Sequence, residues 1–402
     1  MEADTHGHDD CWCHYLPHLI AVRPDQKAQA IAASADSGGR ELENGEACQI
    51  LDGLNHDVVG EILEVVGVIR VEPEDPHEVV ATLNQNGVAA SPVHGVGFLG
   101  HKGYQGSDWI EASEVEIRDP GKAGDRVIAV VDSGIVPDAD LPGWMSGSSV
   151  ESDRPIDTDA LTLKHPVGHG TFVASLIRRI APDCAVSLAS ARPDPGYLES
   201  KDPNHKEAPP PTDELNVLGA VLRLLRRHRE DQKNVRALNL SLGVHACPKD
   251  GFEEFITMRT ACKLWLDRFV DRAPILAAAG NSPCPQPLYP AAFSRDEEFH
   301  GRIRGVAAAR EGAKGGEIKV WQDGTEITAP ERDWVTDAAP GCEIFGLSGQ
   351  SPDHVIEWGG SSFATAVVSA SRCTELSSDS DAGISWWPDR AVTYGAVPNL
   401  RP

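Results

Sequence analysis

Uninterrupted apolar runs in the middle of the chain end in polar motifs that contain glycine. The run at 126–131 is dominated by β-branched residues, and the run at 274–279 is rich in alanine. Such runs are typical of strands that are buried on both faces of a parallel sheet. Stretches with helical character follow at 171–177, 214–229 and 363–370. The alternation predicts an α/β region with a mostly parallel sheet flanked by helices.

The pattern changes in the N-terminal quarter, where shorter strands and helices alternate. Strands are predicted at 18–22, 47–51 and 68–71, and helices at 27–34, 58–66 and 76–85, with 87–90 following the last helix. Short elements in this order are typical of a small α+β domain. We therefore divide the chain into a disordered tail at 1–14, an α+β domain at 15–105, a main domain at 106–375 and an irregular tail at 376–402.

Two irregular stretches interrupt the main domain. Residues 192–213 are rich in Pro, Asp and Lys, which indicates a loop insertion. Residues 310–335 form a second irregular stretch, and long loops of this kind often shape access to a site. The arginines of the stretch 214–229 are expected to form a solvated surface.

Three residue types used in nucleophilic catalysis stand next to glycines or small residues. Asp132 follows the first apolar run, His169 lies between Gly168 and Gly170, and Ser362 lies in Gly-Gly-Ser-Ser-Phe-Ala. Carboxyl ends of parallel strands are where α/β sheets place catalytic groups. A Ser that precedes a helix is often only an N-cap, and a lone His is usually structural. The combination of the three motifs, and not any one of them, therefore indicates a catalytic site.

These motifs, in the order Asp, His, Ser, resemble those of the subtilisin-like serine proteases, or subtilases. The resemblance covers roughly residues 105–375 and implies a three-layer fold with a central, mostly parallel sheet. It also implies that Asn281 donates to the oxyanion. Ser241, Leu242 and Gly243, together with Ala279 and Gly280, are implied to bind substrate. Two positions depart from the family pattern, since Ser175 replaces a usual Gly and Ala366 a usual Pro.

The resemblance implies a serine endopeptidase that hydrolyses peptide bonds through an acyl-enzyme. Asp132, His169 and Ser362 would form the triad. The alternative is a catalytically silent protein of subtilase fold that binds peptides without cutting them. A non-peptidase acyl hydrolase is a third hypothesis. The competent residues at all four catalytic positions favour the endopeptidase.

Residues 15–105 have two interpretations. Subtilase propeptides are small α+β domains that fold against the catalytic domain, so this region is either a built-in prodomain or a retained recognition domain. The prodomain interpretation predicts that it occupies the strand at Ser241–Gly243 and the cleft beside Ser362. It also predicts self-cleavage within about 90–115.

The chain is strongly acidic, with 61 Asp and Glu against 36 Lys and Arg and a formal net charge of −25. This charge argues against nucleic acid or an anionic membrane as a partner. The expected partner is a protein or peptide substrate, and nothing indicates an oligomeric state. No signal peptide or membrane-spanning run is visible, so a cytoplasmic location is expected.

Nine scattered cysteines do not resemble a secreted disulfide framework, and free thiols are expected. Cys247 and Cys284 are the pair that the family fold would bring near each other. No cofactor or metal is expected; calcium sites are frequent in the family, but no such loop is recognisable. The N-terminal tail holds a cluster of metal-ligand types, for which disorder is the simpler interpretation. The cluster comprises His6, His8, Asp9, Asp10, Cys11, Cys13 and His14.

Overall fold

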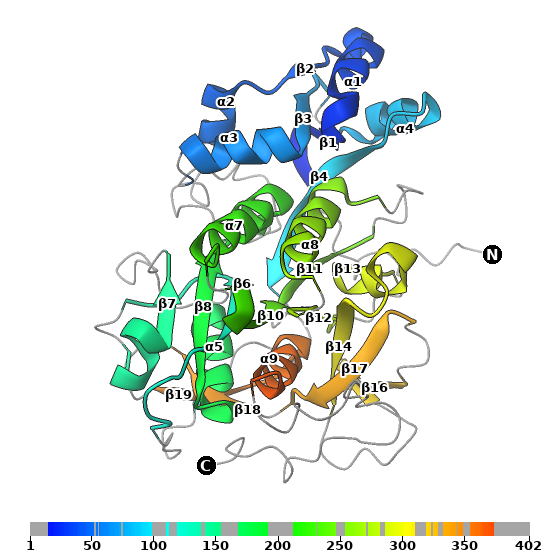
Figure 1. The fold of residues 1–402 in the computed structure, drawn as a ribbon. Helices are drawn as coiled ribbons and strands as arrows, with labels where there is room; N and C mark the ends of the chain where they lie inside the picture. The colour runs from blue at the N-terminus through cyan, green and yellow to red at the C-terminus, as the bar shows by residue number, and fades with distance from the viewer. Residues whose placement is uncertain are drawn as a thin grey trace, which may run out of the picture.

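The computed structural model consists of a small N-terminal unit placed on a larger α/β unit (Figure 1). It describes residues 15–51, 54, 56–73, 75–98, 110–111, 119–137, 141–153, 168–191, 212–230, 232–246, 254–270, 272–281, 286–309, 319–322, 325–328, 333–342, 344–348 and 354–373. The predicted tails at 1–14 and 376–402 lie outside these residues, as do the N-terminal His/Cys cluster and both Cys247 and Cys284.

The N-terminal unit is an antiparallel sheet in the order β4-β1-β3-β2, accompanied by four helices. Its strands are β1 (Tyr15–Val22), β2 (Arg40–Glu41), β3 (Gly67–Arg70) and β4 (Ala90–Phe98). Its helices are α1 (Lys27–Ala33), α2 (Asn44–Ile50), α3 (His56–Val65) and α4 (His77–Gln85). The predicted strands at 18–22 and 68–71 and the three predicted helices correspond to elements of this unit.

The strand predicted at 47–51 is wrong, because this segment belongs to α2. Ala47 and Leu51 are both fully buried, whereas the residues between them are partly or fully exposed. Buried positions four residues apart are the signature of a helix, and a short apolar run did not separate the two possibilities.

Seven parallel strands form the centre of the larger unit, in the order β7-β8-β6-β10-β12-β14-β17. They are β6 (Arg126–Asp132), β7 (Val150–Ser152), β8 (Cys184–Ser190), β10 (Val235–Leu240), β12 (Ile275–Ala278), β14 (Ile303–Ala309) and β17 (Val335–Pro340). Beyond β14, the antiparallel strands β15 (Lys319–Gln322) and β16 (Thr325–Thr328) extend the sheet. The predicted mostly parallel sheet is confirmed.

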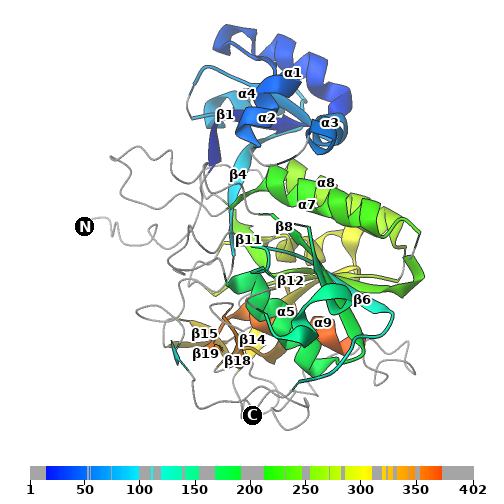
Figure 2. The same ribbon diagram turned by 90° about the vertical axis from the view of Figure 1, so that its left-hand side faces the viewer.

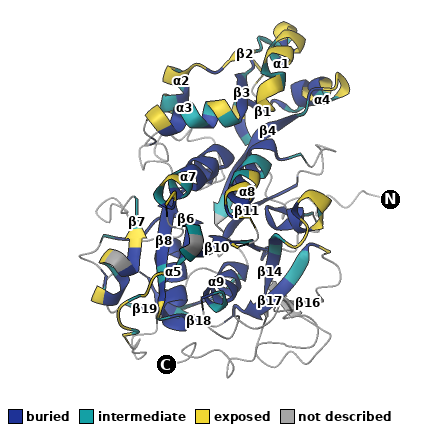
Figure 3. Ribbon diagram, in the orientation of Figure 1, coloured by how far each residue is buried: buried dark blue, intermediate teal, exposed yellow. Residues whose placement is uncertain are grey.

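Helices cover both faces of this sheet (Figure 2). One layer holds α7 (Glu214–Arg227) and α8 (Ile256–Arg268), and the other holds α5 (His169–Ile180) and α9 (Ser361–Ser371). Strand β6 serves both layers, since Ala129 and Val131 belong to the apolar cluster of α7 and α8 and Ile128 and Val130 to that of α5 and α9. The result is the expected three-layer arrangement, with α9 deeply buried (Figure 3).

Strand β4 joins the two units into one continuous sheet. Its first half pairs with β1, and its last residues pair antiparallel with β9 (Thr212–Asp213) and β11 (Leu242–His245). Strand β11 also pairs with β13 (Leu288–Tyr289). Figure 1 shows β4 descending from the N-terminal unit past α7 and α8. A segment of the N-terminal unit is therefore built into the larger one.

The arginines of α7 do not form a plain solvated surface, contrary to the expectation. Arg226 donates to Glu61 of α3 in the N-terminal unit, with an Nε–Oε1 distance of 3.1 Å. Arg223 donates to Asp153 at 2.5 Å from a largely buried position. The face of α7 thus contacts the N-terminal unit and the segment after β7.

Cys184 and Cys373 form a disulfide between the start of β8 and the residues after α9. The expectation of free thiols is wrong for this pair, while Cys48 and Cys262 are free. The two bonded cysteines are 189 positions apart, so no local spacing could have indicated the pair. None of the described helices has the length and apolar composition needed to cross a bilayer.

Candidate active site

Asp132 and His169 meet at the carboxyl end of the parallel sheet. Asp132 is the last residue of β6, and His169 is the first residue of α5. The imidazole Nδ1 donates to Asp132 Oδ1 at 2.8 Å, and both side chains are almost completely buried. The backbone N–H of Ser133 donates to the same carboxylate oxygen at 2.7 Å. These bonds fix one edge of the imidazole and leave Nε2 on the opposite edge.

The glycines that flank His169 allow this approach. A Cβ on Gly170 would lie 2.2 Å from the carbonyl oxygen of Gly134, and one on Gly168 would lie 2.5 Å from that of Ser348. Neither backbone oxygen can move away cheaply. The Gly-His-Gly motif therefore follows from close packing of the first turn of α5 against two other backbone segments.

Aromatic rings fix the imidazole from the other directions. Trp358 is the last residue of β19 (Val355–Trp358), which pairs with β18 (Ile344–Leu347) and β5 (Ile110–Glu111). The ring centroids of Trp358 and His169 are 5.6 Å apart in an edge arrangement, and those of Phe363 and His169 are 5.5 Å apart. No sequence motif indicated Trp358. Its contact depends on the fold of the small sheet.

Ser362 is the second residue of α9 and is fully buried. Its Oγ donates to the carbonyl oxygen of Ser241 at 3.1 Å. The adjacent Phe363 ring contacts His169, so the structure brings Ser362 into the neighbourhood of the Asp132–His169 pair. The N-terminal end of α9 directs backbone N–H groups and the positive end of its dipole toward this region.

Asn281 anchors the first turn of α9. Its Oδ1 accepts a hydrogen bond from the backbone N–H of Ser361 at 2.7 Å, which directs the Nδ2 donor group away from that N–H. The backbone N–H of Gly280 donates to Ser361 Oγ at 3.2 Å. Two bonds therefore tie the end of β12 to the helix that carries Ser362.

A buried polar contact joins α9 to β10. Ser241 Oγ lies 2.8 Å from Asn239 Oδ1 and 3.0 Å from the Ser362 carbonyl oxygen. Asn239 Nδ2 donates to Ser369 Oγ at 3.0 Å, two helical turns further along α9. The sequence analysis did not single out Asn239 as a functional residue. It bridges the strand before Ser241 to the helix that begins at Ser361.

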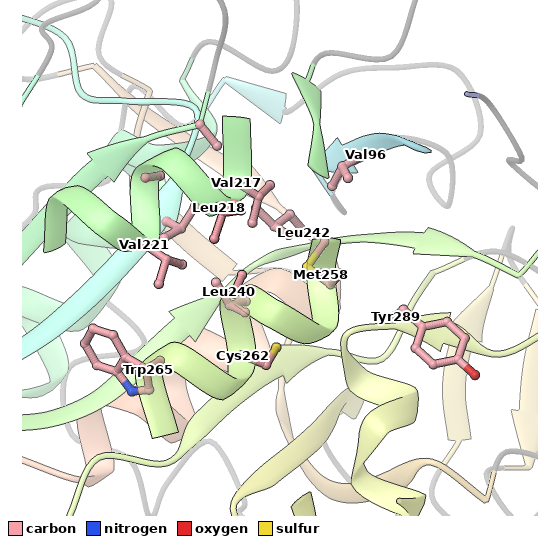
Figure 4. Packing of buried hydrophobic residues seen from close by; sticks show 14 of the residues in the cluster. Val96, Val217, Leu218, Val221, Leu240, Leu242, Met258, Cys262, Trp265 and Tyr289 are labelled. Carbon is pink, nitrogen blue, oxygen red and sulfur yellow. The ribbon is translucent and has the colours of Figure 1, made fainter. Parts of the chain in front are cut away.

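Leu242 and Gly243 pair with an extended segment of the same chain, and their role in binding substrate stays a prediction. The segment is β4, with Leu242 opposite Phe98 and Gly243 opposite Gly97. On its other side β4 pairs with β9, with Val96 opposite Thr212. Val96 is fully buried in the apolar cluster that also contains Val217, Leu218, Leu242 and Met258 (Figure 4).

Ala279 and Gly280 use their backbone groups inside the protein. Ala279 donates its N–H to Val306 and accepts a hydrogen bond from Trp334 Nε1 at 3.2 Å. Gly280 contacts Ser361, as described above. Both residues lie next to Asn281 at the site, and their role in binding substrate stays a prediction.

No protein-family model matches the chain, and no curated protein sequence matches it. Among solved structures, fervidolysin from Fervidobacterium pennivorans, a keratinolytic enzyme related to subtilisin, matches with a TM-score of 0.54 at 14% identity. The match covers 92% of this chain and 55% of the fervidolysin chain. The chain has a subtilisin-like fold. This chain spans little more than half the length of fervidolysin, and at this identity the likeness concerns the fold alone.

Weaker matches include two other solved structures. The prenylagaramide maturation protease PagA has a TM-score of 0.40 at 20% identity, covering 62% of this chain and 74% of that one. The A-subunit of the AB5 toxin from E. coli has a TM-score of 0.41 at 21% identity, covering 64% and 79%.

One departure from the family pattern has a structural explanation within the subtilisin-like fold. The hydroxyl of Ser175 donates to the Phe172 carbonyl at 2.8 Å and accepts from the Leu347 N–H at 3.1 Å. Ser175 therefore ties α5, which carries His169, to β18 of the small sheet. The hydroxyl therefore adds a contact between α5 and the small sheet.

The part of the chain that the structure describes contains no group of three or more His, Cys, Asp or Glu side chains arranged to hold a metal ion. The calcium and cofactor expectations stay predictions.

Asp213 is a buried carboxyl group in β9, the strand that pairs with β4. It caps α7 by accepting from the backbone N–H of Asn216 at 2.9 Å and from its Nδ2 at 2.8 Å. Burial raises the pKa of Asp213 from 3.8 to about 6, because loss of hydration outweighs these two hydrogen bonds. The neighbouring Glu214 adds to the upward shift.

The raised pKa of Asp213 predicts a pH-dependent stability term. Between pH 3.8 and about 6 the folded protein holds a proton on Asp213 that the unfolded chain releases. The contribution of Asp213 to the free energy of unfolding is therefore largest at low pH and is lost as the pH rises through about 6. Asp213→Asn keeps a capping side chain and removes the term. The unfolding midpoint of the variant minus that of the wild type should therefore increase from pH about 4 to about 7. A pH-independent difference would contradict the assignment.

Proposed function

We propose that the chain is a serine endopeptidase that uses Asp132, His169 and Ser362. The observation that carries the proposal is the buried 2.8 Å hydrogen bond between His169 Nδ1 and Asp132 Oδ1, located beside the N-terminus of the helix that bears Ser362. A carboxylate bound at Nδ1 selects the tautomer in which Nε2 can accept a proton. The subtilisin-like fold supports a protease function for this arrangement.

In the proposed reaction, Ser362 Oγ attacks the carbonyl carbon of a peptide bond and its proton passes to His169 Nε2. Asp132 stabilises the imidazolium, which then donates the proton to the leaving amine. Water hydrolyses the acyl-enzyme by the same sequence, with His169 as the base. The hydroxyl of Ser362 donates to Ser241 in the structure, so the first step requires its proton to turn toward His169.

Asn281 is the proposed side-chain donor to the oxyanion. Its Oδ1 accepts from the Ser361 N–H, which orients the amide, and its NH₂ group is the proposed donor to the negative charge that develops on the carbonyl oxygen. The backbone N–H of Ser362 would supply a second donor at the start of α9. Fixed donors of this kind stabilise the transition state more than the ground state.

The proposed substrates are proteins or peptides bound in extended form along β11. The pairing of β4 with Leu242 and Gly243 provides an intramolecular example of such binding. Main-chain hydrogen bonds would give affinity, and side-chain pockets would give selectivity.

The same pairing supports a prodomain role for the N-terminal unit. Strand β4 fills the place where a substrate would bind, so the attached unit would inhibit until the connection is cut. The register points to the location of the cut. Residues 97 and 98 oppose 243 and 242, and Ser241, which immediately precedes β11, accepts a hydrogen bond from Ser362 Oγ. The bond that reaches Ser362 should therefore lie within a few residues after Phe98.

Ser362→Ala should abolish labelling by a fluorophosphonate probe and cleavage of peptides, because it removes the proposed nucleophile. Ser361→Ala is the matched control on the same helix turn and should retain labelling. If Ser361→Ala removed activity and Ser362→Ala did not, the nucleophile would be assigned to the wrong serine. If the folded wild-type protein neither reacted with the probe nor cut a peptide library, the silent peptide-binding alternative would hold.

Asn281→Ala should lower kcat by about 100- to 1000-fold with a smaller change in KM, because its donor acts most strongly once the oxyanion forms. Steady-state kinetics on one peptide substrate measure both constants. A change confined to KM would assign Asn281 to substrate binding.

The prodomain interpretation predicts self-processing. The wild-type protein should cut itself within a few residues after Phe98, because β4 ends there opposite Leu242, next to the residue that contacts Ser362. The Ser362→Ala protein, which lacks the proposed nucleophile, should stay full length. Intact mass spectrometry of the two purified proteins measures the outcome. The released N-terminal fragment, added back, should inhibit. A wild-type protein that keeps all 402 residues, is fully active and is not inhibited by the fragment would show a retained domain instead.

A further inference from the structure

The boundary between the two units contains a fully buried carboxylate. Glu214 is the first residue of α7, and its Oε2 accepts from the backbone N–H of His94 at 2.9 Å and lies 3.0 Å from His94 Nδ1. Its Oε1 accepts from the backbone N–H of Met258 at 3.3 Å. Among the described residues, no Lys or Arg forms an ion pair with Glu214, so its charged contact is with a side chain of β4.

Aromatic rings complete the pocket around the His94 imidazole. The ring of Phe255 lies 4.5 Å from that of His94 between centroids and is tilted by 35°. The ring of Phe255 is itself stacked on Tyr289 at 4.3 Å. An aromatic face and a carboxylate that meet on one planar side chain form a site suited to a cationic nitrogen group.

The N-terminal ends of two helices meet at Glu214. It lies in the first turn of α7, and the N–H of Met258 comes from the first turn of α8. The positive ends of two helix dipoles therefore converge on one carboxylate.

His94 and Val96 lie two residues apart on β4, so their side chains point to the same face of the strand. Val96 occupies the apolar pocket beside Leu242, and His94 occupies the pocket formed by Glu214 and Phe255. A peptide that replaced β4 in the same register would place its own side chains in these two positions.

We propose that Glu214 is a specificity-determining residue that selects substrates with an imidazole or guanidinium side chain two residues before the aliphatic residue in the Val96 position. This inference rests on the proposed function, because it assumes that a substrate follows the path of β4. The chain's own His94 is then the intramolecular counterpart of the selected residue.

The selection follows from the cost of desolvating a carboxylate. An extended peptide would cover Glu214 and remove its water. Its backbone N–H would satisfy Oε2 in part, but an alanine in this position would leave the charge without a cationic partner. A site built around a buried polar group discriminates strongly against ligands that lack the matching donor.

The test compares three peptides with the sequence of residues 92–103, PVHGVGFLGHKG, which differ only at the third position: His, Arg or Ala. The protein is the full chain after any self-processing. For the wild type, kcat/KM should fall about tenfold or more from His to Ala, as expected for a hydrogen bond to a charged group, and the Arg peptide should stay within about threefold of His.

Two variants assign the selectivity to one carboxylate. In Glu214→Gln the ratio of kcat/KM for the His and Ala peptides should fall below about threefold, because the charge is gone. Glu254→Gln removes a partly exposed carboxylate next to Phe255 and should keep the wild-type ratio. Equal kcat/KM for the His and Ala peptides in the wild type, or an unchanged ratio in Glu214→Gln, would overturn the proposal.

A second measurement does not depend on catalysis. In the Ser362→Ala full chain, the unfolding midpoints of His94→Ala, Glu214→Gln and the double variant form a cycle. If the two side chains interact, the decrease in unfolding midpoint of the double variant should be smaller than the sum of the decreases of the two single variants. His94→Arg should lower the midpoint much less than His94→Ala does. If no peptide were cut but the cycle showed this coupling and the Arg rescue, the pocket would stand and the protease function would fail. Additive losses, or no rescue by Arg, would overturn the pocket.

Discussion

The position of the proposed nucleophile depends on the hydrogen bonds that hold the first turn of α9. This helix is almost wholly buried, and apolar packing alone is non-directional, so it specifies the rotation of a helix poorly. The bonds from Asn281 and Gly280 to Ser361 fix the first turn, and the bond from Asn239 to Ser369 fixes the helix two turns later. Polar groups in this core therefore set the direction in which Ser362 points.

A second constraint is that one strand serves two units. Because β4 is covalently attached, it competes for β11 at a high effective concentration. The exposed ion pair between Arg226 and Glu61 contributes little to this attachment, about 1 kcal/mol or less. The buried contacts of Val96 and of His94 with Glu214 contribute more, because they exclude water from apolar and charged groups. In the proposed prodomain role, release of the N-terminal unit would break the same contacts that a bound substrate would replace.

Much of the central fold could be predicted from the sequence, because local signals there agree with tertiary packing. The β-branched run before Asp132 is buried on both faces, and the glycines beside His169 are required by two close backbone contacts. The position of β4 was harder to predict. Its Pro92 and the glycines at 95 and 97 weaken the strand pattern, and only pairing with three other strands, β1, β9 and β11, makes the segment extended.

Other features were hidden because they join distant residues. His94 and Glu214 are 120 positions apart, and neither belongs to a motif. Trp358 reaches His169 only through the fold of the small sheet. A contact of this kind has no periodicity or spacing in the sequence, so the three motifs could locate the catalytic candidates but could not describe the surroundings that orient them and select their ligands.

Helix α9 is bonded to the central sheet at both of its ends, in contrast to strand β4. Its first turn is bonded to the end of β12, while after its last turn Cys373 is linked to Cys184 of β8 and its carbonyl accepts from Arg126 of β6. Strand β6 carries Asp132 and pairs with β8, so the helix with Ser362 and the strand with Asp132 are held together at both ends of the layer. Strand β4 is held differently, by pairing with β9 and β11 and by the side-chain contacts of Val96 and His94. In the proposed function, a fixed catalytic frame beside a replaceable strand would allow one site to be inhibited by its own chain and then to bind other chains in the same register.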